Sequence, residues 1–286
     1  MGLCRRVVGL PVLTHPMRLS ELLRRPHALP VVPDVAARLI ATFYQDEVDL
    51  QRIAGEVERD PALAVRLLRQ ANSSFFRLVR PVHSVRDAVA VLGLNKVRAL
   101  VLAAAVQDRF PAVPGMDLDT FWRYSFAAAT VARLICAPRR LDENVAFTAG
   151  LLHGVGELVM HTGMPEVMQP IEQASPLLSL ARARTEYGAL GYSYAEAGAA
   201  LVRHWHLPPL LVAAIGQHRN PFDHDPLEPL AAVVHMAAWR ARLLVSGNRR
   251  DDLIHTYPDP VGELLGLDPD WLVAPDAAGL DQLLQA

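Results

Sequence analysis

The sequence has only two cysteines, Cys4 and Cys136, and they form no Cys-x-x-Cys pair. It therefore has no disulfide framework, and Cys136 lies in an apolar helical pattern typical of a core position. The longest candidate for a membrane span, residues 99–106, is far shorter than the roughly 18 apolar residues that a transmembrane helix needs. The first residues also lack the apolar stretch of a signal peptide. These absences predict a cytoplasmic protein without membrane insertion.

Aromatic residues are also scarce, at 6% of the chain, and they do not alternate with basic residues. A binding platform for single-stranded nucleic acid needs such an alternation. Residues 1–110 contain 16 basic against 10 acidic residues, whereas residues 111–286 contain 12 against 20. A small excess spread over several helices is more typical of a solvated face than of a nucleic-acid footprint, although it also suits a basic docking surface. We therefore do not expect nucleic acid as a partner.

No segment of useful length alternates apolar and polar residues as a half-buried strand does. Signals for helix starts recur instead, each with a side chain that can accept a backbone N–H. These starts are expected at Asp60, Ser84, Asn95, Asp119, Asp142 and Ser193. The sequence thus predicts an all-α fold of helices joined by short turns.

One stretch, residues 110–115 (FPAVPG), cannot continue a helix because of its two prolines. It separates an amino-terminal helical lobe, residues 27–110, from a second lobe, residues 117–245. Residues 1–26 form an amino-terminal extension in this division. Residues 246–286 form an acidic carboxy-terminal extension, in which Asp and Glu outnumber Arg by 8 to 2. Short helices are expected there at residues 261–265 and 279–285.

Two segments of the second lobe resemble the core of the HD superfamily: residues 121–125 (FWRYS) and residues 150–156 (GLLHGVG). In that superfamily a helix carrying His precedes a helix that ends in Leu-Leu-His-Asp-Ile-Gly, and these side chains bind divalent metal for phosphoester hydrolysis. Here Tyr124 replaces the first His and Gly154 replaces the Asp. A phenol that titrates near 10 and a glycine do not readily supply metal ligands. The resemblance implies the fold without the metal chemistry.

Further segments resemble, in order and spacing, the HDOD domains, which are HD-related output modules of bacterial signalling proteins. The matching segments are residues 29–33 (LPVVP), 59–63 (RDPAL), 68–73 (LRQANS), 92–98 (LGLNKVR), 186–188 (EYG), 198–201 (GAAL) and 205–208 (WHLP). The resemblance covers residues 27 to 245. It implies a two-lobed helical HDOD fold in which the second lobe is an HD-like helical bundle.

The HD pattern can be carried over one position at a time. Its vestigial positions are Tyr124, His153 and Gly154, with Tyr194 at the position of a downstream HDOD histidine. The last Asp of a catalytic HD site would fall near residues 237–238, which are both alanine. One surviving imidazole is too few, because hydrolytic metal centres usually have at least three protein ligands. We therefore expect no catalytic residue, no metal and no cofactor.

His153 has three interpretations. Lone buried imidazoles are usually bonded to a backbone carbonyl, which is the structural interpretation. The hydroxyls of Tyr124 and Tyr194 could instead bond to it across the old metal site. His153 could also belong to a ligand pocket. The residues of that possible pocket are Arg123, His153, His218, Arg219 and His235.

The resemblance implies a non-enzymatic module of bacterial signal transduction that binds a regulatory or signalling protein. The basic amino-terminal lobe is the expected docking surface, with Arg77, Arg80 and Arg86 as candidate contacts. A nucleotide-binding sensor that keeps the pocket without turnover is one alternative. A residual metal-dependent phosphohydrolase, with ligands outside the motif, is the other.

Overall fold

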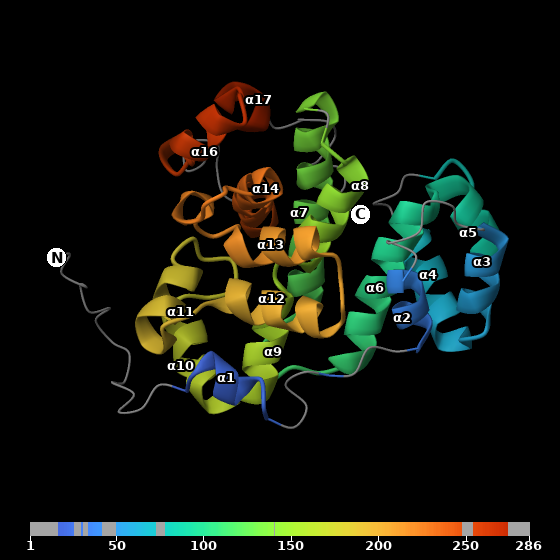
Figure 1. Cartoon of the computed structure of the whole chain (residues 1–286), viewed down its shortest axis with the longest axis horizontal. Coiled ribbons are helices and arrows are strands. Elements are labelled where there is room, and N and C mark those ends of the chain that lie inside the picture. The colour runs from blue at the N-terminus through green and yellow to red at the C-terminus, as the bar shows by residue number, and fades with distance from the viewer. Residues whose placement is uncertain are drawn as a thin grey trace.

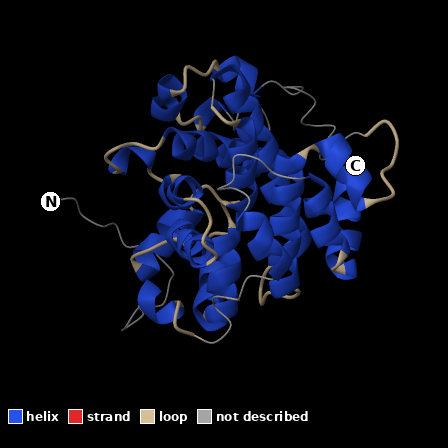
Figure 2. Ribbon diagram, turned by 45° about the vertical axis from the view of Figure 1, so that its right-hand side comes forward, coloured by secondary structure: helices blue, strands red, loops and turns tan. Residues whose placement is uncertain are grey.

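The computed structural model describes residues 17–25, 30, 34–41, 50–72, 78–139, 141–247 and 254–273. Every regular element within these ranges is a helix (Figure 2), which confirms the all-α prediction. None of the helices in the described part combines the length and the apolar character needed to cross a bilayer.

The amino-terminal lobe contains helices α2 to α6, at the right of Figure 1. Its core includes Leu63, Leu67 and Ala71, the apolar stripe that helical spacing places on one face of α4. The helices are α2 (Asp34–Ala41), α3 (Leu50–Glu58), α4 (Pro61–Ala71), α5 (Val85–Leu92) and α6 (Leu94–Arg109).

The HD-like lobe contains helices α7 to α14. Helix α7 packs along both α8 and α14, and α12 packs against α9 and α13. These central helices bring the vestigial HD positions together. The helices are α7 (Leu118–Cys136), α8 (Glu143–Leu152), α9 (Val155–Gly163), α10 (Pro165–Ala174), α11 (Arg182–Leu190), α12 (Tyr194–His204), α13 (Pro209–Gln217) and α14 (Pro229–Ser246).

Three short helices near the ends of the chain also pack on the HD-like lobe: α1 (Leu19–Leu22), α16 (Asp259–Leu264) and α17 (Pro269–Val273). Helix α1 lies beside α9 and α10 in Figure 1, and the Arg25 guanidinium after it donates to the Gly163 carbonyl at 2.6 Å. The side chain of Arg240 on α14 donates to the Leu272 carbonyl of α17 at 2.7 Å. The short helix expected at residues 261–265 is α16, whereas residues 279–285 lie outside the described residues.

Local capping signals account for several helix starts. Asp60, Ser84 and Asp142 accept backbone N–H groups of the first turn, as predicted. Ser193 and Glu196 form a capping box at the start of α12. These four starts depend on neighbours within one turn, so the sequence alone could identify them.

Two predicted starts were wrong by one or two residues. Asn95 does not cap α6, because the turn at Gly93, with φ of 81°, lets the helix begin at Leu94. At α7 the N-cap is Asp117, whose carboxylate accepts the N–H of Asp119 at 3.0 Å. At α7 two aspartates were available as the cap, whereas α6 begins after a glycine turn without a side-chain cap.

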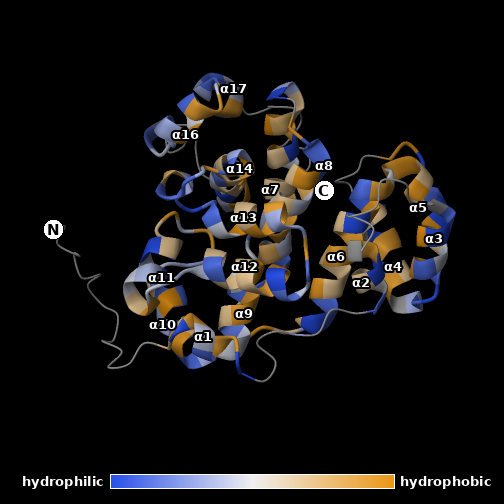
Figure 3. Cartoon of the chain, in the orientation of Figure 1, coloured by the Kyte–Doolittle hydropathy of each residue, from blue (hydrophilic) through white to orange (hydrophobic). Residues whose placement is uncertain are grey.

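Helix α6 joins the two lobes. Residues Val97 and Val101 pack in the amino-terminal core, whereas Leu102 and Val106 pack in the core of the HD-like lobe. Figure 3 shows the mainly hydrophobic middle of this helix. No helix occurs between α6 and α7, at residues 110–117. The two lobes therefore share apolar contacts along α6, while the domain ranges given above stay predictions.

Candidate functional site

Five side chains from five helices or their ends converge in the HD-like lobe, and we call them the vestigial site. They are Tyr124 on α7, His153 after α8, Tyr194 at the start of α12, His218 after α13 and Arg242 on α14. Each is at most 2% exposed. The site is thus a buried polar cluster inside an apolar bundle.

The turn between α8 and α9 positions His153. Helix α8 ends at Leu152, and Gly154 is already the N-cap of α9. A Cβ at Gly154 would lie 3.3 Å from the Phe121 ring, so even the first atom of an aspartate side chain would be crowded. The glycine at the old Asp position therefore suits the packing of this turn.

A close approach between α9 and α12 positions Tyr194. A Cβ at Gly156 would overlap the backbone carbonyl of Tyr194, and Gly198 lies opposite on α12. Glycines at such crossings let two helix backbones approach closely. Gly156 thus allows the first residue of α12 to lie against the start of α9, directly after the turn that carries His153.

Hydrogen bonds to backbone carbonyls fix the tautomers of two histidines. Nδ1 of His153 lies 2.6 Å from the Gly150 carbonyl oxygen, and Nδ1 of His218 lies 2.7 Å from that of Ile215. A carbonyl can only accept, so each Nδ1 carries the proton and each Nε2 of a neutral ring is an acceptor. Burial, together with the charge of the nearby Arg242 guanidinium, lowers the pKa of His153 to about 3. Burial also lowers the pKa of His218 well below its usual value.

A chain of hydrogen bonds runs through Tyr194. The Arg242 Nη2 donates to the Tyr194 hydroxyl at 2.7 Å, and this hydroxyl donates to Nε2 of His218 at 3.3 Å. The proposed bond from Tyr194 to His153 is thus wrong, since the hydroxyl of Tyr194 is used by His218. Tyr124 packs edge-to-face on His153 with ring centroids 4.8 Å apart, but its hydroxyl has no hydrogen-bond partner among the described residues.

Arg242 was not among the residues expected at the site. Its Cζ lies 5.3 Å from the ring centroid of Tyr124 and 6.0 Å from that of Tyr194. Arg242 follows Ala238 by four residues and His235 by seven, so helical periodicity places all three on one face of α14. The sequence did contain a signal for Arg242. It is a basic residue within a long apolar helix, one turn after the position where a catalytic HD site has its last Asp.

This set of donors does not suit a divalent metal. The vestigial site offers two neutral imidazoles and two phenols, and it contains a guanidinium that repels a second cation. Burial raises the pKa of Tyr124, which further disfavours a phenolate ligand. Within the described ranges no three His, Cys, Asp or Glu side chains are grouped so that they could hold a metal ion.

The residues of the possible ligand pocket are only partly brought together. Nδ1 of His235 donates to the backbone carbonyl of His218 at 2.7 Å, and burial, reinforced by Arg219, lowers the pKa of His235 to about 4. The Nε of Arg219 is buried, and no residue in the described part of the chain bonds to it. Arg123 does not belong to the pocket, because its side chain is exposed. Consecutive residues of a helix point about 100° apart, so Arg123 faces away when Tyr124 faces inward.

A second buried cluster is centred on Arg182, and the sequence did not predict it. Its guanidinium donates to Glu157 at 2.6 Å, to Glu186 at 2.7 Å and to Glu172 at 2.6 Å. Burial and the neighbouring Glu157 raise the pKa of Glu186 well above its usual value. Glu186 also accepts the backbone N–H of Tyr194 at 2.8 Å. The motif Glu186-Tyr187-Gly188 was the available signal, and its Glu ties α11 to the start of α12.

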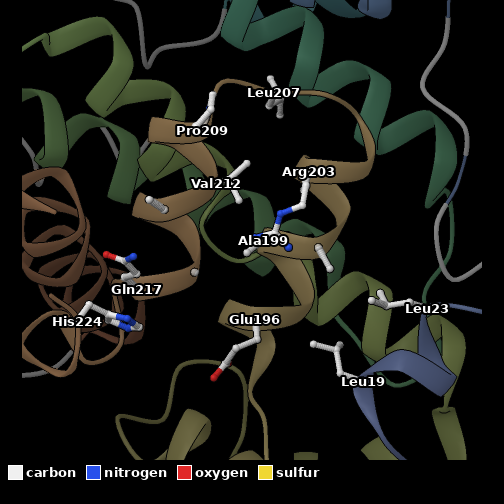
Figure 4. Close-up of a pocket in the computed structure, with 13 residues that line it drawn as sticks. Leu19, Leu23, Glu196, Ala199, Arg203, Leu207, Pro209, Val212, Gln217 and His224 are labelled. Carbon is white, nitrogen blue, oxygen red and sulfur yellow. The ribbon is translucent and has the colours of Figure 1, made fainter. Parts of the chain in front are cut away.

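An open cavity of about 590 Å³ lies on the outer side of α12 and α13 (Figure 4). Leu19 and Leu23, from α1 and its end, form part of its wall, and Glu196, Arg203 and Gln217 are among its polar residues. None of the five residues of the vestigial site lines this cavity. The buried polar cluster and the open cavity are therefore separate features of the HD-like lobe.

Several solved structures resemble this chain. "Putative phosphohydrolase" from Shewanella amazonensis SB2B has a TM-score of 0.74 and 30% identity, and the match covers 92% of this chain and 97% of that one. "HDOD domain protein with unknown function" from Geobacter sulfurreducens has a TM-score of 0.74 and 24% identity, with coverage of 90% and 92%. "Putative signal transduction protein" from Marinobacter aquaeolei VT8 has a TM-score of 0.70 and 25% identity, with coverage of 94% and 59%.

At the level of sequence, an uncharacterized protein of Treponema pallidum is 24% identical over 220 residues. This chain spans 42% of the length of that curated relative. The family pattern of the HDOD domain matches residues 29–221, well over half of the chain. The helical architecture agrees with that match, and the chain belongs to the HDOD domain family.

Proposed function

We propose that this HDOD protein is a non-enzymatic signal-transduction module that acts by binding another regulatory protein. One observation carries the proposal: the Arg242 guanidinium lies within the vestigial site, bonded to Tyr194 and close to the ring of Tyr124. The similar structure from Marinobacter aquaeolei is named "Putative signal transduction protein", which supports a role in signalling.

The chemistry of the site supports the non-enzymatic part. Hydrolysis of a phosphoester by an HD enzyme needs metal-activated water, and a fixed guanidinium disfavours the metal. His153 is a poor general acid because its pKa of about 3 leaves it neutral at physiological pH. No carboxylate of the described residues belongs to the vestigial site, so a carboxylate base is missing as well.

The residues from 78 to 92 on the amino-terminal lobe offer a docking surface, and we call them the 78–92 surface. Arg80 and Arg86 are exposed on it, and Val79 is 100% exposed. Arg86 has an exposed ion pair with Glu58 at 3.4 Å, which contributes little and can be exchanged for a partner's carboxylate. Arg77, the third expected contact, lies outside the described residues. An acidic protein surface is the complementary partner.

Affinity capture from the host tests this surface. Charge reversal at Arg80→Glu with Arg86→Glu should weaken capture of the partner by at least about tenfold at low salt, with a smaller difference at high salt. The matched control is reversal at Arg184→Glu with Arg203→Glu, two exposed arginines of the HD-like lobe. Equal loss of capture by both pairs would contradict a specific role of the 78–92 surface.

The rival function is a residual phosphohydrolase. It is favoured by the Shewanella structure, which is 30% identical and is named "Putative phosphohydrolase". Purified protein should show no manganese-dependent hydrolysis of a generic phosphodiester such as bis(p-nitrophenyl) phosphate. It should also carry no stoichiometric iron or manganese. Metal or activity that is present in the wild type and lost in a folded His153→Ala variant would favour the phosphohydrolase.

A further inference from the structure

Arg242 is a buried cation to which the described residues supply no carboxylate counter-ion. Its side chain is 2% exposed, and an arginine keeps its charge at every physiological pH. Within the described part of the chain, no carboxylate lies within ion-pair distance of it, whereas Arg182 in the same lobe contacts three. An unpaired buried charge is strongly unfavourable. Unlike Arg182, Arg242 has a side-chain hydrogen bond and aromatic neighbours but no carboxylate, so its charge is available to a small anion.

Unpartnered polar atoms surround this cation. Nε of Arg242, the hydroxyl of Tyr124 and Nε2 of His153 are all buried without a hydrogen-bond partner among the described residues. Such atoms are rare in native proteins, and here they come from three side chains of one site. The Nε of Arg219 is a fourth, and its charge acts on both His153 and His218.

The roles of these atoms are defined by the bonds already made. Arg242 Nε–H and the Tyr124 hydroxyl are free to donate. Nε2 of His153 must accept, because Nδ1 holds the ring's proton against the Gly150 carbonyl. A complementary molecule therefore carries negative charge, at least two acceptor oxygens and one proton that it can donate.

We propose that the vestigial site binds inorganic phosphate. Two of its oxygens would accept hydrogen bonds from Arg242 Nε and the Tyr124 hydroxyl, and its protonated oxygen would donate to Nε2 of His153. Its charge would neutralise the guanidinium. The site would then give a protein-binding signalling module a small-molecule input, which goes beyond the proposed function.

Other occupants suit the site less well. A water molecule could satisfy the hydrogen bonds but would leave the charge of Arg242 unpaired. Sulfate would supply the charge but carries no proton for His153 at neutral pH. A nucleotide would need an opening for its sugar and base, and the five side chains of the site are at most 2% exposed. Phosphate is small, anionic and still protonated.

Equilibrium dialysis of the full chain against radiolabelled phosphate at constant ionic strength tests the proposal. Binding should saturate near one phosphate per chain, and sulfate should compete at least about tenfold more weakly. Thermal unfolding in the same buffers should shift upward with phosphate, since a ligand of the folded state stabilises it. No saturable binding, equal affinity for sulfate, or tighter binding of a nucleoside monophosphate than of phosphate would overturn the proposal.

Variants locate the binding. Arg242→Gln should weaken phosphate binding by at least about 100-fold, and Tyr124→Phe, which removes one hydroxyl, by about tenfold. The matched control is Arg240→Gln, which removes an equally buried guanidinium from the same helix but from a bond to the Leu272 carbonyl. This control should retain phosphate binding. If Arg242→Gln does not fold, Tyr124→Phe decides the matter, and wild-type affinity in a folded Tyr124→Phe would contradict the assigned site.

Discussion

Acidification from pH 7 to pH 5 should destabilise this protein through His153. The imidazole has a pKa near 6.5 in an unfolded chain but about 3 in the fold, where burial disfavours its charged form. Between these two values the unfolded chain binds a proton that the folded chain does not. The contribution of His153 to stability is therefore full above pH 6.5 and is lost as the pH falls toward 3. The loss between pH 7 and pH 5 is about 2 kcal/mol.

Urea unfolding of the wild type and of His153→Asn at pH 8, 7, 6 and 5 measures this contribution of His153 to the free energy of unfolding. Asparagine keeps an N–H that can donate to the Gly150 carbonyl, while it removes the titrating group. The difference in free energy of unfolding between the two proteins should change by about 2 kcal/mol between pH 7 and pH 5, with the wild type losing more. His224→Asn serves as the control for loss of an exposed histidine.

The comparison with His153→Asn is needed because other groups titrate in the same range. His235, with its pKa of about 4, adds a loss of the same sign. Glu186 has the opposite effect. Because its pKa is raised in the folded protein, its contribution to the free energy of unfolding decreases as the pH increases. A difference between wild type and His153→Asn that stays constant within about 0.5 kcal/mol would refute the buried neutral imidazole.

Four further outcomes are expected. Tyr124→His combined with Gly154→Asp should still bind no stoichiometric metal by elemental analysis, because the buried guanidinium stays in the site; restored metal binding would argue against that reasoning. Gly156→Ala should lower the free energy of unfolding by about 3 kcal/mol or more, because the methyl group overlaps the backbone of α12. Gly188→Ala, on an open helix face, should instead raise it by about 0.5–1 kcal/mol. Arg182→Met should cost about 3–5 kcal/mol in urea unfolding by leaving buried carboxylates unpaired, and a near-neutral result would contradict the ion-pair account.

Local sequence determined most helices of this protein. The starts at Ser84, Asp142 and Ser193 could be identified because a cap acts on N–H groups two or three residues away. The apolar stripe of α4 could be identified because helical periodicity fixes which residues share a face. The motif around His153 also indicated a site with few metal ligands, because a ligand is a property of the residue type.

Contacts between distant segments were decided only by the tertiary structure. Arg242 lies 118 positions after Tyr124 in the sequence, and its place in the vestigial site depends on the packing of α14 against α7. Arg123 was expected in the pocket, yet helix α7 presents it to solvent. The ion pairs of Arg182 could not be predicted either, because its three carboxylate partners come from three different helices, α9, α10 and α11. Periodicity predicts the face of a helix, but which helix covers that face is decided by the packing of the whole lobe.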